Sequence, residues 1–272
     1  MKTQVIGALA LAGSMVFNTA VANETISVVG SSSVSPIMEV LGETYAQSNN
    51  VTIEVQGPGS SAGVRAAHDG SSDLGMSSRN LKSSEKADNI KEVVIARDGI
   101  AVVVHNNNSV SDLSKEDVAK IYKGEITNWN QVGGENKPIV VATRDTASGT
   151  RGAFEDIMKL KKKINGIKVS AISQRAQVAS GNGQLKTIVA NNPFAIGYIS
   201  LGSVDGSVKP LAIDNHQPSV EAIKSGEYGV QRPFLVVYKE GRPSKSALEF
   251  LAWVKSPEAQ KIVANKGFIS VK

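Results

Sequence analysis

The sequence predicts an α/β fold made of two units, with mixed, mostly parallel sheets flanked by helices. Short β-branched apolar runs alternate with helix-like segments through nearly all of the chain after residue 22. Such alternation is typical of parallel strands joined by helical crossovers. The runs 93–96 and 100–104 are continuously apolar, as expected of strands buried on both faces. A length of 272 residues suits about two domains.

Residues 1–22 differ from the rest and predict a secretory signal peptide. Lys2 gives a positive start, residues 5–17 are largely apolar, and Ala20-Val21-Ala22 has the small-residue pattern of a cleavage site. The apolar run is shorter than the roughly 18 residues that a membrane helix needs, and no later run reaches that length. We therefore expect export from the cytoplasm, with cleavage after Ala22.

The first unit runs from the end of the leader to about residue 105. In order, the elements expected in it are strand 26–29, helix 36–47, strand 51–55, helix 62–68 and strands 74–76, 93–96 and 100–104. Each helix follows a turn rich in glycine and serine, which favours a helix start.

The second unit begins after the polar segment Asn106–Ser109, which interrupts the apolar pattern. Ser114, followed by two acidic residues, predicts a capped helix start. The later elements expected are strand 139–142, helices 149–161 and 183–191, strands 195–199 and 234–238, and helices 244–254 and 257–265. The basic run 159–163 is interpreted as the solvated end of helix 149–161, where cations suit the helix dipole.

Composition excludes several function classes. The chain has no cysteine and three histidines, none of them four residues from another, so neither thiolate nor histidine-cluster metal sites are predicted. We expect no cofactor. The net charge of +5 is mild, and the cations are scattered apart from 159–163, so we expect no nucleic-acid binding. A modest positive balance does fit a small anionic ligand.

Three loops combine glycine and hydroxyl residues directly before an expected helix. They are Gly30–Pro36, Gly59–Gly63 and Arg144–Arg151. At a helix start several backbone N–H groups lack helical partners and the dipole adds positive potential, so an anion fits there. The third loop opens with arginine, whose forked donors suit tetrahedral oxyanions. Together the loops predict an oxyanion site.

Other motifs give weaker predictions. Gly59–Gly63 matches G-x-S-x-G, the nucleophile elbow of serine hydrolases, with Ser61 as nucleophile, but no histidine is marked as its base. The chain has no Gly-Lys pair, which excludes a P-loop. The glycines at 57, 59 and 63 miss the spacing of a dinucleotide-binding loop.

Six segments in this order resemble the periplasmic phosphate-binding proteins of ABC-type phosphate importers. They are Gly30–Pro36, Gly57–Gly63, Asp73–Arg79, Ile121–Trp129, Arg144–Thr150 and Phe194–Leu201. They extend over nearly all of the chain after the leader.

The resemblance implies a type II, two-lobe venus-flytrap receptor that closes on one inorganic phosphate and delivers it to inner-membrane ABC permease subunits. Residues 23–105 with 206–272 would form lobe 1, and 106–205 lobe 2. The family's phosphate ligands fall here on Ser32, Ser33, Ser60, Ser78, Arg144, Ser148, Gly149 and Thr150. A periplasmic, monomeric protein without enzyme activity is implied.

The chain departs from this family at Ser78, where long members have an aspartate that accepts the phosphate proton and repels sulfate. A hydroxyl can accept a hydrogen bond but does not repel charge, so sulfate or another tetrahedral oxyanion is the main alternative ligand. Arg79 next to it either contacts the ligand or pairs with a carboxylate. A secreted serine hydrolase and an adhesive interaction protein are the alternatives from other classes.

Overall fold

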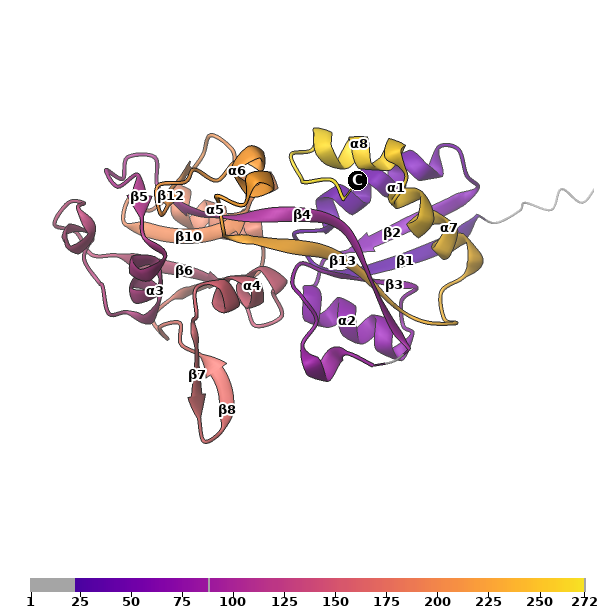
Figure 1. The fold of residues 1–272 in the computed structure, drawn as a ribbon, viewed down its shortest axis with the longest axis horizontal. Helices are drawn as coiled ribbons and strands as arrows, with labels where there is room; N and C mark the ends of the chain where they lie inside the picture. The colour runs from indigo at the N-terminus through magenta and orange to yellow at the C-terminus, as the bar shows by residue number, and fades with distance from the viewer. Residues whose placement is uncertain (1–22, 88, 272) are drawn as a thin grey trace, which may run out of the picture.

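The computed structural model describes residues 23–87 and 89–271, and they form a mixed α/β fold (Figure 1). The α-helices are α1 (Ser35–Ala46), α2 (Ser60–Asp69), α3 (Lys115–Lys123), α4 (Gly149–Ile157), α5 (Asn182–Ala190), α6 (Val220–Ser225), α7 (Lys245–Val254) and α8 (Pro257–Asn265). The strands are β1 (Glu24–Gly30), β2 (Val51–Gln56), β3 (Leu74–Ser77), β4 (Ile90–Val104), β5 (Asp112–Leu113), β6 (Val140–Arg144), β7 (Lys161–Ile164), β8 (Ile167–Ser170), β9 (Gln177–Ala179), β10 (Ala195–Ser200), β11 (Lys209–Pro210), β12 (Ala212–Ile213) and β13 (Gln231–Lys239). The predicted α/β class is confirmed.

One nine-stranded sheet runs through the molecule in the order β2-β1-β3-β13-β4-β10-β6-β9, with β11 also on β4. The strands β2, β1 and β3 are parallel at one end, and β10, β6 and β9 are parallel at the other. The antiparallel pair β4 and β13 joins these groups. The first part of β4 pairs with β13, and its last five residues pair with β10, so β4 extends into both halves.

Helices cover both faces of each half of the sheet. In the first half, α1, α7 and α8 pack on one face and α2 on the other. In the second half, α3 and α4 share a core with Ile196 and Tyr198, while α5 packs against Ala195 and Ile199. These residues alternate along β10, which is buried at all six positions. Two cores therefore stand on either side of the β4–β13 junction.

Hydroxyl caps begin α3 and α4, as the sequence predicts for Ser114, and a left-handed glycine ends α3. Ser114 accepts a hydrogen bond from the Asp117 N–H at the start of α3, and Ser148 does the same from Arg151 in α4. The C-cap of α3, Gly124, has φ 80°, a conformation that favours glycine.

The helix expected over 149–161 ends at Ile157, and the interpretation of the lysine run as a helix end is wrong. Residues 161–164 form β7, which pairs with β8 in an antiparallel hairpin. The connecting residues Asn165 and Gly166 have φ values of 49° and 80°, as a tight hairpin turn requires. The Asn-Gly pair between apolar residues is the signal that predicts this hairpin.

The predicted lobe boundaries at 105 and 206 stay a prediction. Residues Leu211, Ile223, Tyr228 and Val230 are buried in the same core as α3 and α4. The predicted signal peptide, 1–22, lies outside the described residues. Within 23–87 and 89–271, no helix is both long and apolar enough to span a bilayer.

Replacing Gly63 with alanine is expected to destabilise the fold although alanine favours helices. A Cβ at Gly63 would lie 2.4 Å from the Val29 carbonyl oxygen and 2.8 Å from that of Met76, because α2 rests directly on β1 and β3. Backbone cannot move aside cheaply, so we expect a loss of about 1–3 kcal/mol in the free energy of unfolding, measured by urea denaturation.

The matched control is Gly183→Ala in α5, where a Cβ meets nothing within 4 Å. This change is expected to raise stability by up to about 1 kcal/mol. Equal effects of the two substitutions would contradict the close approach of α2 to the sheet.

Candidate functional site

Arg144 lies at the C-terminal end of β6 and is buried, with 1% of its surface exposed. Its Nη1 donates to Asn182 Oδ1 at 3.2 Å, and its Nη2 donates to Ser32 Oγ and the Ser180 carbonyl oxygen, both at 3.0 Å. Its Nε has no hydrogen-bond partner among the described residues. The contacts of this buried cation with the described residues are therefore to uncharged oxygens.

Burial is the main influence on the charge of this group. It lowers the pKa of the Arg144 guanidinium, Asp145 next to it opposes the shift, and the cationic Arg232 adds to it. A buried charge of this kind is costly unless a counter-ion meets it. The arrangement suits a bound anion.

Four helices begin around Arg144. The loop before α1 contributes Ser33, α2 begins at Ser60, α4 begins at Gly149 and α5 begins at Asn182. Each start turns unpaired N–H groups and the positive end of a helix dipole toward this region. Contacts described below link these starts one to the next, from Asn182 to Ser33, from Ser33 to Thr150 and from Gly149 to Ser60.

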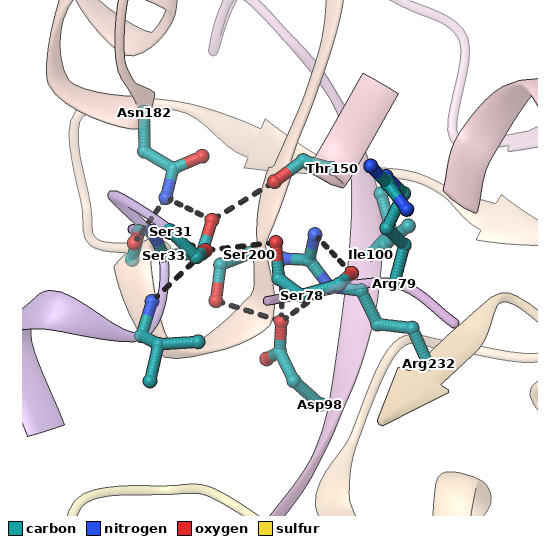
Figure 2. Close-up of polar contacts among 12 residues, drawn as sticks. Ser31, Ser33, Ser78, Arg79, Asp98, Ile100, Thr150, Asn182, Ser200 and Arg232 are labelled. Atoms are coloured by element: carbon teal, nitrogen blue, oxygen red, sulfur yellow. Dashed lines mark hydrogen bonds and ion pairs between the residues drawn. The ribbon is translucent and has the colours of Figure 1, made fainter. Parts of the chain in front are cut away.

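Hydroxyl groups from the two halves of the sheet meet here (Figure 2). Ser33 Oγ lies 2.9 Å from Thr150 Oγ1 and accepts a hydrogen bond from Asn182 Nδ2 at 3.0 Å. Ser31 Oγ donates to Ser78 Oγ at 2.8 Å. A hydroxyl both donates and accepts, so these groups can bond to one another or to an oxyanion.

Gly149 lets the two halves approach closely. A Cβ there would lie 2.1 Å from Ser60 Oγ and 2.6 Å from Ser78 Oγ. At the same seam, the Ser61 N–H donates to the Ala147 carbonyl oxygen at 3.1 Å. The first turn of α2 and the loop before α4 are thus in direct contact.

The structure brings eight of the nine sequence-predicted residues together in one cluster, which is buried apart from the half-buried Ser32. They are Ser32, Ser33, Ser60, Ser78, Arg144, Ser148, Gly149 and Thr150. The side chain of Ser148 acts as the cap of α4, accepting from the Arg151 N–H. Their role as ligands stays a prediction.

Arg79 is the exception, because its side chain turns to a carboxylate. Its two terminal nitrogens donate to Glu85 at 2.7 and 2.8 Å, which is a bidentate ion pair. Of the two roles expected for Arg79, the geometry favours the structural pair. The guanidinium of Arg79 holds the pKa of the Glu85 carboxyl below its usual range against the opposing effect of burial.

Sequence reasoning missed Asn182 and Ser31. Asn182 contacts both Arg144 and Ser33, and it follows Ser180-Gly181 at the start of α5. That small polar segment before a helix is the same signal that singled out the other loops. Ser31 lies inside a predicted loop, and its Oγ accepts from the Ser33 N–H at 3.2 Å.

Sequence reasoning also missed a buried ion pair behind the cluster, at the β4–β13 junction. Asp98 and Arg232 are register partners on these strands, and Arg232 Nη2 donates to Asp98 Oδ2 at 2.8 Å, with 1% of either side chain exposed. Arg232 also donates to the Ser78 carbonyl oxygen at 3.3 Å, and Asp98 accepts from Ser200 Oγ at 2.9 Å (Figure 2). Burial raises the pKa of the Asp98 carboxyl, and Arg232 opposes that shift.

A family model described as a PBP superfamily domain matches residues 18–258. The chain belongs to the PBP superfamily. Within it, the phosphate-binding protein PstS of Bacillus subtilis is 30% identical over 92% of this chain and 82% of its own. The predicted resemblance to phosphate-binding proteins is confirmed by this relationship.

Two solved PBP structures are similar over nearly the same span. A phosphate ABC transporter substrate-binding protein with bound phosphate from Clostridium perfringens is 42% identical, with a TM-score of 0.86, covering 92% of this chain and all of that one. An ABC-type phosphate transport receptor from Vibrio cholerae is 40% identical, with a TM-score of 0.77, covering 90% and 99%. These relatives are named as binding proteins, in agreement with the prediction that the chain is not an enzyme.

Removing one partner of the Asp98–Arg232 pair is expected to destabilise the protein strongly. Arg232→Met leaves a buried carboxylate without its counter-ion, which costs about 3–5 kcal/mol in the free energy of unfolding. Urea denaturation measures the loss.

The double variant Asp98→Leu/Arg232→Met serves as the control. It removes both charges and is expected to recover most of the lost stability, because a well-packed apolar pair often matches a buried ion pair. A double variant no more stable than Arg232→Met would show that the charge pairing is not what holds this junction.

Proposed function

We propose that the chain binds one inorganic phosphate between two lobes, at the cluster around Arg144, and delivers it to inner-membrane ABC permease subunits. The observation that carries the proposal is the buried Arg144 guanidinium, which has a free Nε and only uncharged partners among the described residues. An oxyanion would supply the missing counter-charge and accept from the surrounding helix starts. The phosphate binding for which the relatives are named supports the same ligand.

In this proposal the hydroxyl-to-hydroxyl contacts give way to contacts with the anion. Ser32, Ser33, Ser60, Ser78, Ser148 and Thr150 offer hydroxyls, Gly149 offers a backbone N–H, and Asn182 joins them. Since Ser33 and Thr150 come from different halves of the sheet, an anion held by both binds the closed state better than an open one. A ligand shifts a conformational equilibrium only through such differential affinity.

We propose that the two lobes meet where the paired strands β4 and β13 cross from one core to the other, near residues 99 and 231. Ile100 and Val230 lie in the core with α3 and α4, whereas Ala96 and Phe234 lie in the core with α1. This assigns residues 206–230 to the second lobe and revises the boundaries expected from the resemblance. We further propose a periplasmic monomer whose leader is cleaved after Ala22.

Sulfate or another tetrahedral oxyanion is the second candidate ligand, and Ser78 is the observation that favours it. The Ser78 hydroxyl is buried and hydrogen-bonded to Ser31, so a neutral group stands where a carboxylate would repel a fully ionised anion. Hydroxyl donors serve phosphate and sulfate alike.

For the serine hydrolase alternative, Ser61 Oγ accepts from Arg79 Nη2 at 3.4 Å, and no histidine in the described residues bonds to it. The adhesive alternative gains no specific support from the site.

Arg144→Ala is expected to weaken phosphate binding by on the order of 30-fold to several thousandfold, because removing one partner of a buried charged pair costs about 2–5 kcal/mol. Calorimetric titration of the protein stripped of anion measures the change. Arg175→Ala removes the same charge from an exposed position and should leave affinity unchanged. If Arg144→Ala bound phosphate with unchanged affinity, the assignment of the site would be wrong.

The same titration, repeated with excess sulfate present, separates the two candidate ligands. Undisturbed phosphate binding supports a phosphate-specific receptor, and equal competition supports the broader oxyanion receptor.

Gly149→Ala is expected to weaken phosphate binding without unfolding the protein. Its Cβ would overlap the Ser60 and Ser78 hydroxyls in the closed state, while alanine is well tolerated at a helix start. An overpacking cost of about 1–3 kcal/mol predicts a roughly 5- to 150-fold loss of affinity.

Gly152→Ala, one turn further along α4, is the matched control. Its Cβ would meet the flexible Arg79 side chain, which can move aside, so a smaller loss is expected. If both variants bind like the unaltered protein in calorimetry, the close approach of α4 to the first half is not needed for binding.

A further inference from the structure

The β7–β8 hairpin projects from the second half of the molecule, away from the sheet and its helices (Figure 1). We call residues 159–170 the lysine hairpin. Every residue from 161 to 168 is exposed. Its base is anchored, because Leu160 is fully buried and its carbonyl oxygen accepts from the Ala171 N–H at 2.8 Å. The hairpin is therefore a firmly based, solvated protrusion.

The tip of the lysine hairpin carries two apolar side chains. Ile164 and Ile167 are register partners on either side of the turn, and 50% and 67% of their surfaces are exposed. Ile167 has the largest exposed fraction among the large apolar side chains of the described residues. Neither side chain belongs to a hydrophobic core of the described residues.

Cations surround this apolar tip. The hairpin contains Lys159, Lys161, Lys162, Lys163 and Lys168. Lys163 and Lys168 are register partners next to the isoleucine pair. Among the described residues only Lys161 of these five forms an ion pair, with Asp156. No acidic residue occurs in the sequence from 157 to 204, so the protrusion is strongly positive.

We propose that the tip of the lysine hairpin inserts into an anionic phospholipid surface. The chemistry fits because lysines beside a membrane pair with anionic headgroups, while their aliphatic stems and neighbouring apolar side chains enter the interface. A convex tip with two isoleucines needs a partner that can deform around it. A fluid lipid surface does so, whereas a protein partner would need a matching hollow.

The position of the hairpin determines which part of the molecule would face the membrane when the tip is inserted. Helix α4 begins at Gly149, in the cluster around Arg144, and leads into the hairpin through Met158–Leu160. A groove beside it is lined by Lys161 and Lys168 on one side and by Arg79 and Lys82 from the first half on the other. Insertion of the tip would bring this seam between the halves close to the membrane.

The test is co-sedimentation with lipid vesicles, using the chain from residue 23 so that the apolar leader cannot itself enter lipid. The two cores lie within 23–271, and a similar solved structure covers the same share of the chain. The probes are vesicles of phosphatidylcholine alone and vesicles in which part of it is replaced by the anionic lipid phosphatidylglycerol. Binding is expected only to the anionic vesicles and should fall as salt rises.

Two sets of variants separate charge from insertion. Lys162→Gln/Lys163→Gln/Lys168→Gln is expected to lower the partition coefficient on the order of a hundredfold, since each lysine near an anionic surface contributes about fivefold. Ile164→Ser/Ile167→Ser is expected to lower it at least about tenfold while leaving the charge unchanged.

The matched controls lie far from the hairpin in sequence. Lys255→Gln/Lys261→Gln/Lys266→Gln removes three exposed lysines from the C-terminal segment, and Leu248→Ser removes an exposed apolar side chain from α7. Neither should change partitioning.

Vesicle binding is read without phosphate, so the outcome is independent of the proposed ligand. The proposal is overturned if the protein fails to bind anionic vesicles at low salt. It is also overturned if the lysine control variant loses as much binding as the hairpin lysine variant, or if the isoleucine variant binds as well as the unaltered protein. If vesicles do not bind the protein and the hairpin variants still reduce phosphate uptake in cells, the hairpin contacts a protein instead.

Discussion

A buried arginine without a carboxylate partner is the constraint around which this structure is arranged. Arg144 is removed from water, and its contacts are to an amide oxygen, a hydroxyl and a carbonyl. Taking a charge out of water costs several kcal/mol unless other groups compensate. The oxygens that compensate come from the loop before α1 and from the start of α5, so these two helices must begin near Arg144. The starts of α2 and α4 join the same cluster through Ser60, Gly149 and Thr150. The sheet order, in which parallel strands lead into these helices, meets that requirement.

The second requirement is that the two groups of loops can meet while belonging to different cores. The strands β4 and β13 meet this requirement, because they connect the parallel groups of strands at the two ends of the sheet (Figure 1). Asp98 and Arg232 fix this junction from within. The pair also contacts Ser78, in the cluster around Arg144, and Ser200, on strand β10 of the second half. Stability and the geometry of the cluster therefore depend on the same two side chains.

The sequence predicts those parts of the fold and site that depend on local chemistry. Apolar runs locate the buried strands, and serine or glycine before a helix locates the loops that gather around Arg144. The hairpin at Asn165–Gly166 was also local and readable, but the lysines before it suggested a helix end. Asp98 and Arg232 could not be paired in advance, because their contact depends on the register of strands 134 positions apart. The packing of Tyr228 and Val230 against the core of α3 and α4 is non-local in the same way, and no local pattern in the sequence indicates it.

The hydroxyl cluster has a consequence for how such a receptor signals its state. Ser33 and Thr150 bond to each other between the two halves, so in the closing proposed above those groups would be satisfied even before a ligand arrives. A low cost of closing raises the share of molecules already in the binding-competent form, and apparent affinity rises with that share. The same property narrows the difference in shape between loaded and empty molecules. A transport partner that recognised closure alone would then also bind empty molecules. It would have to distinguish loaded from empty molecules by how slowly the loaded ones reopen.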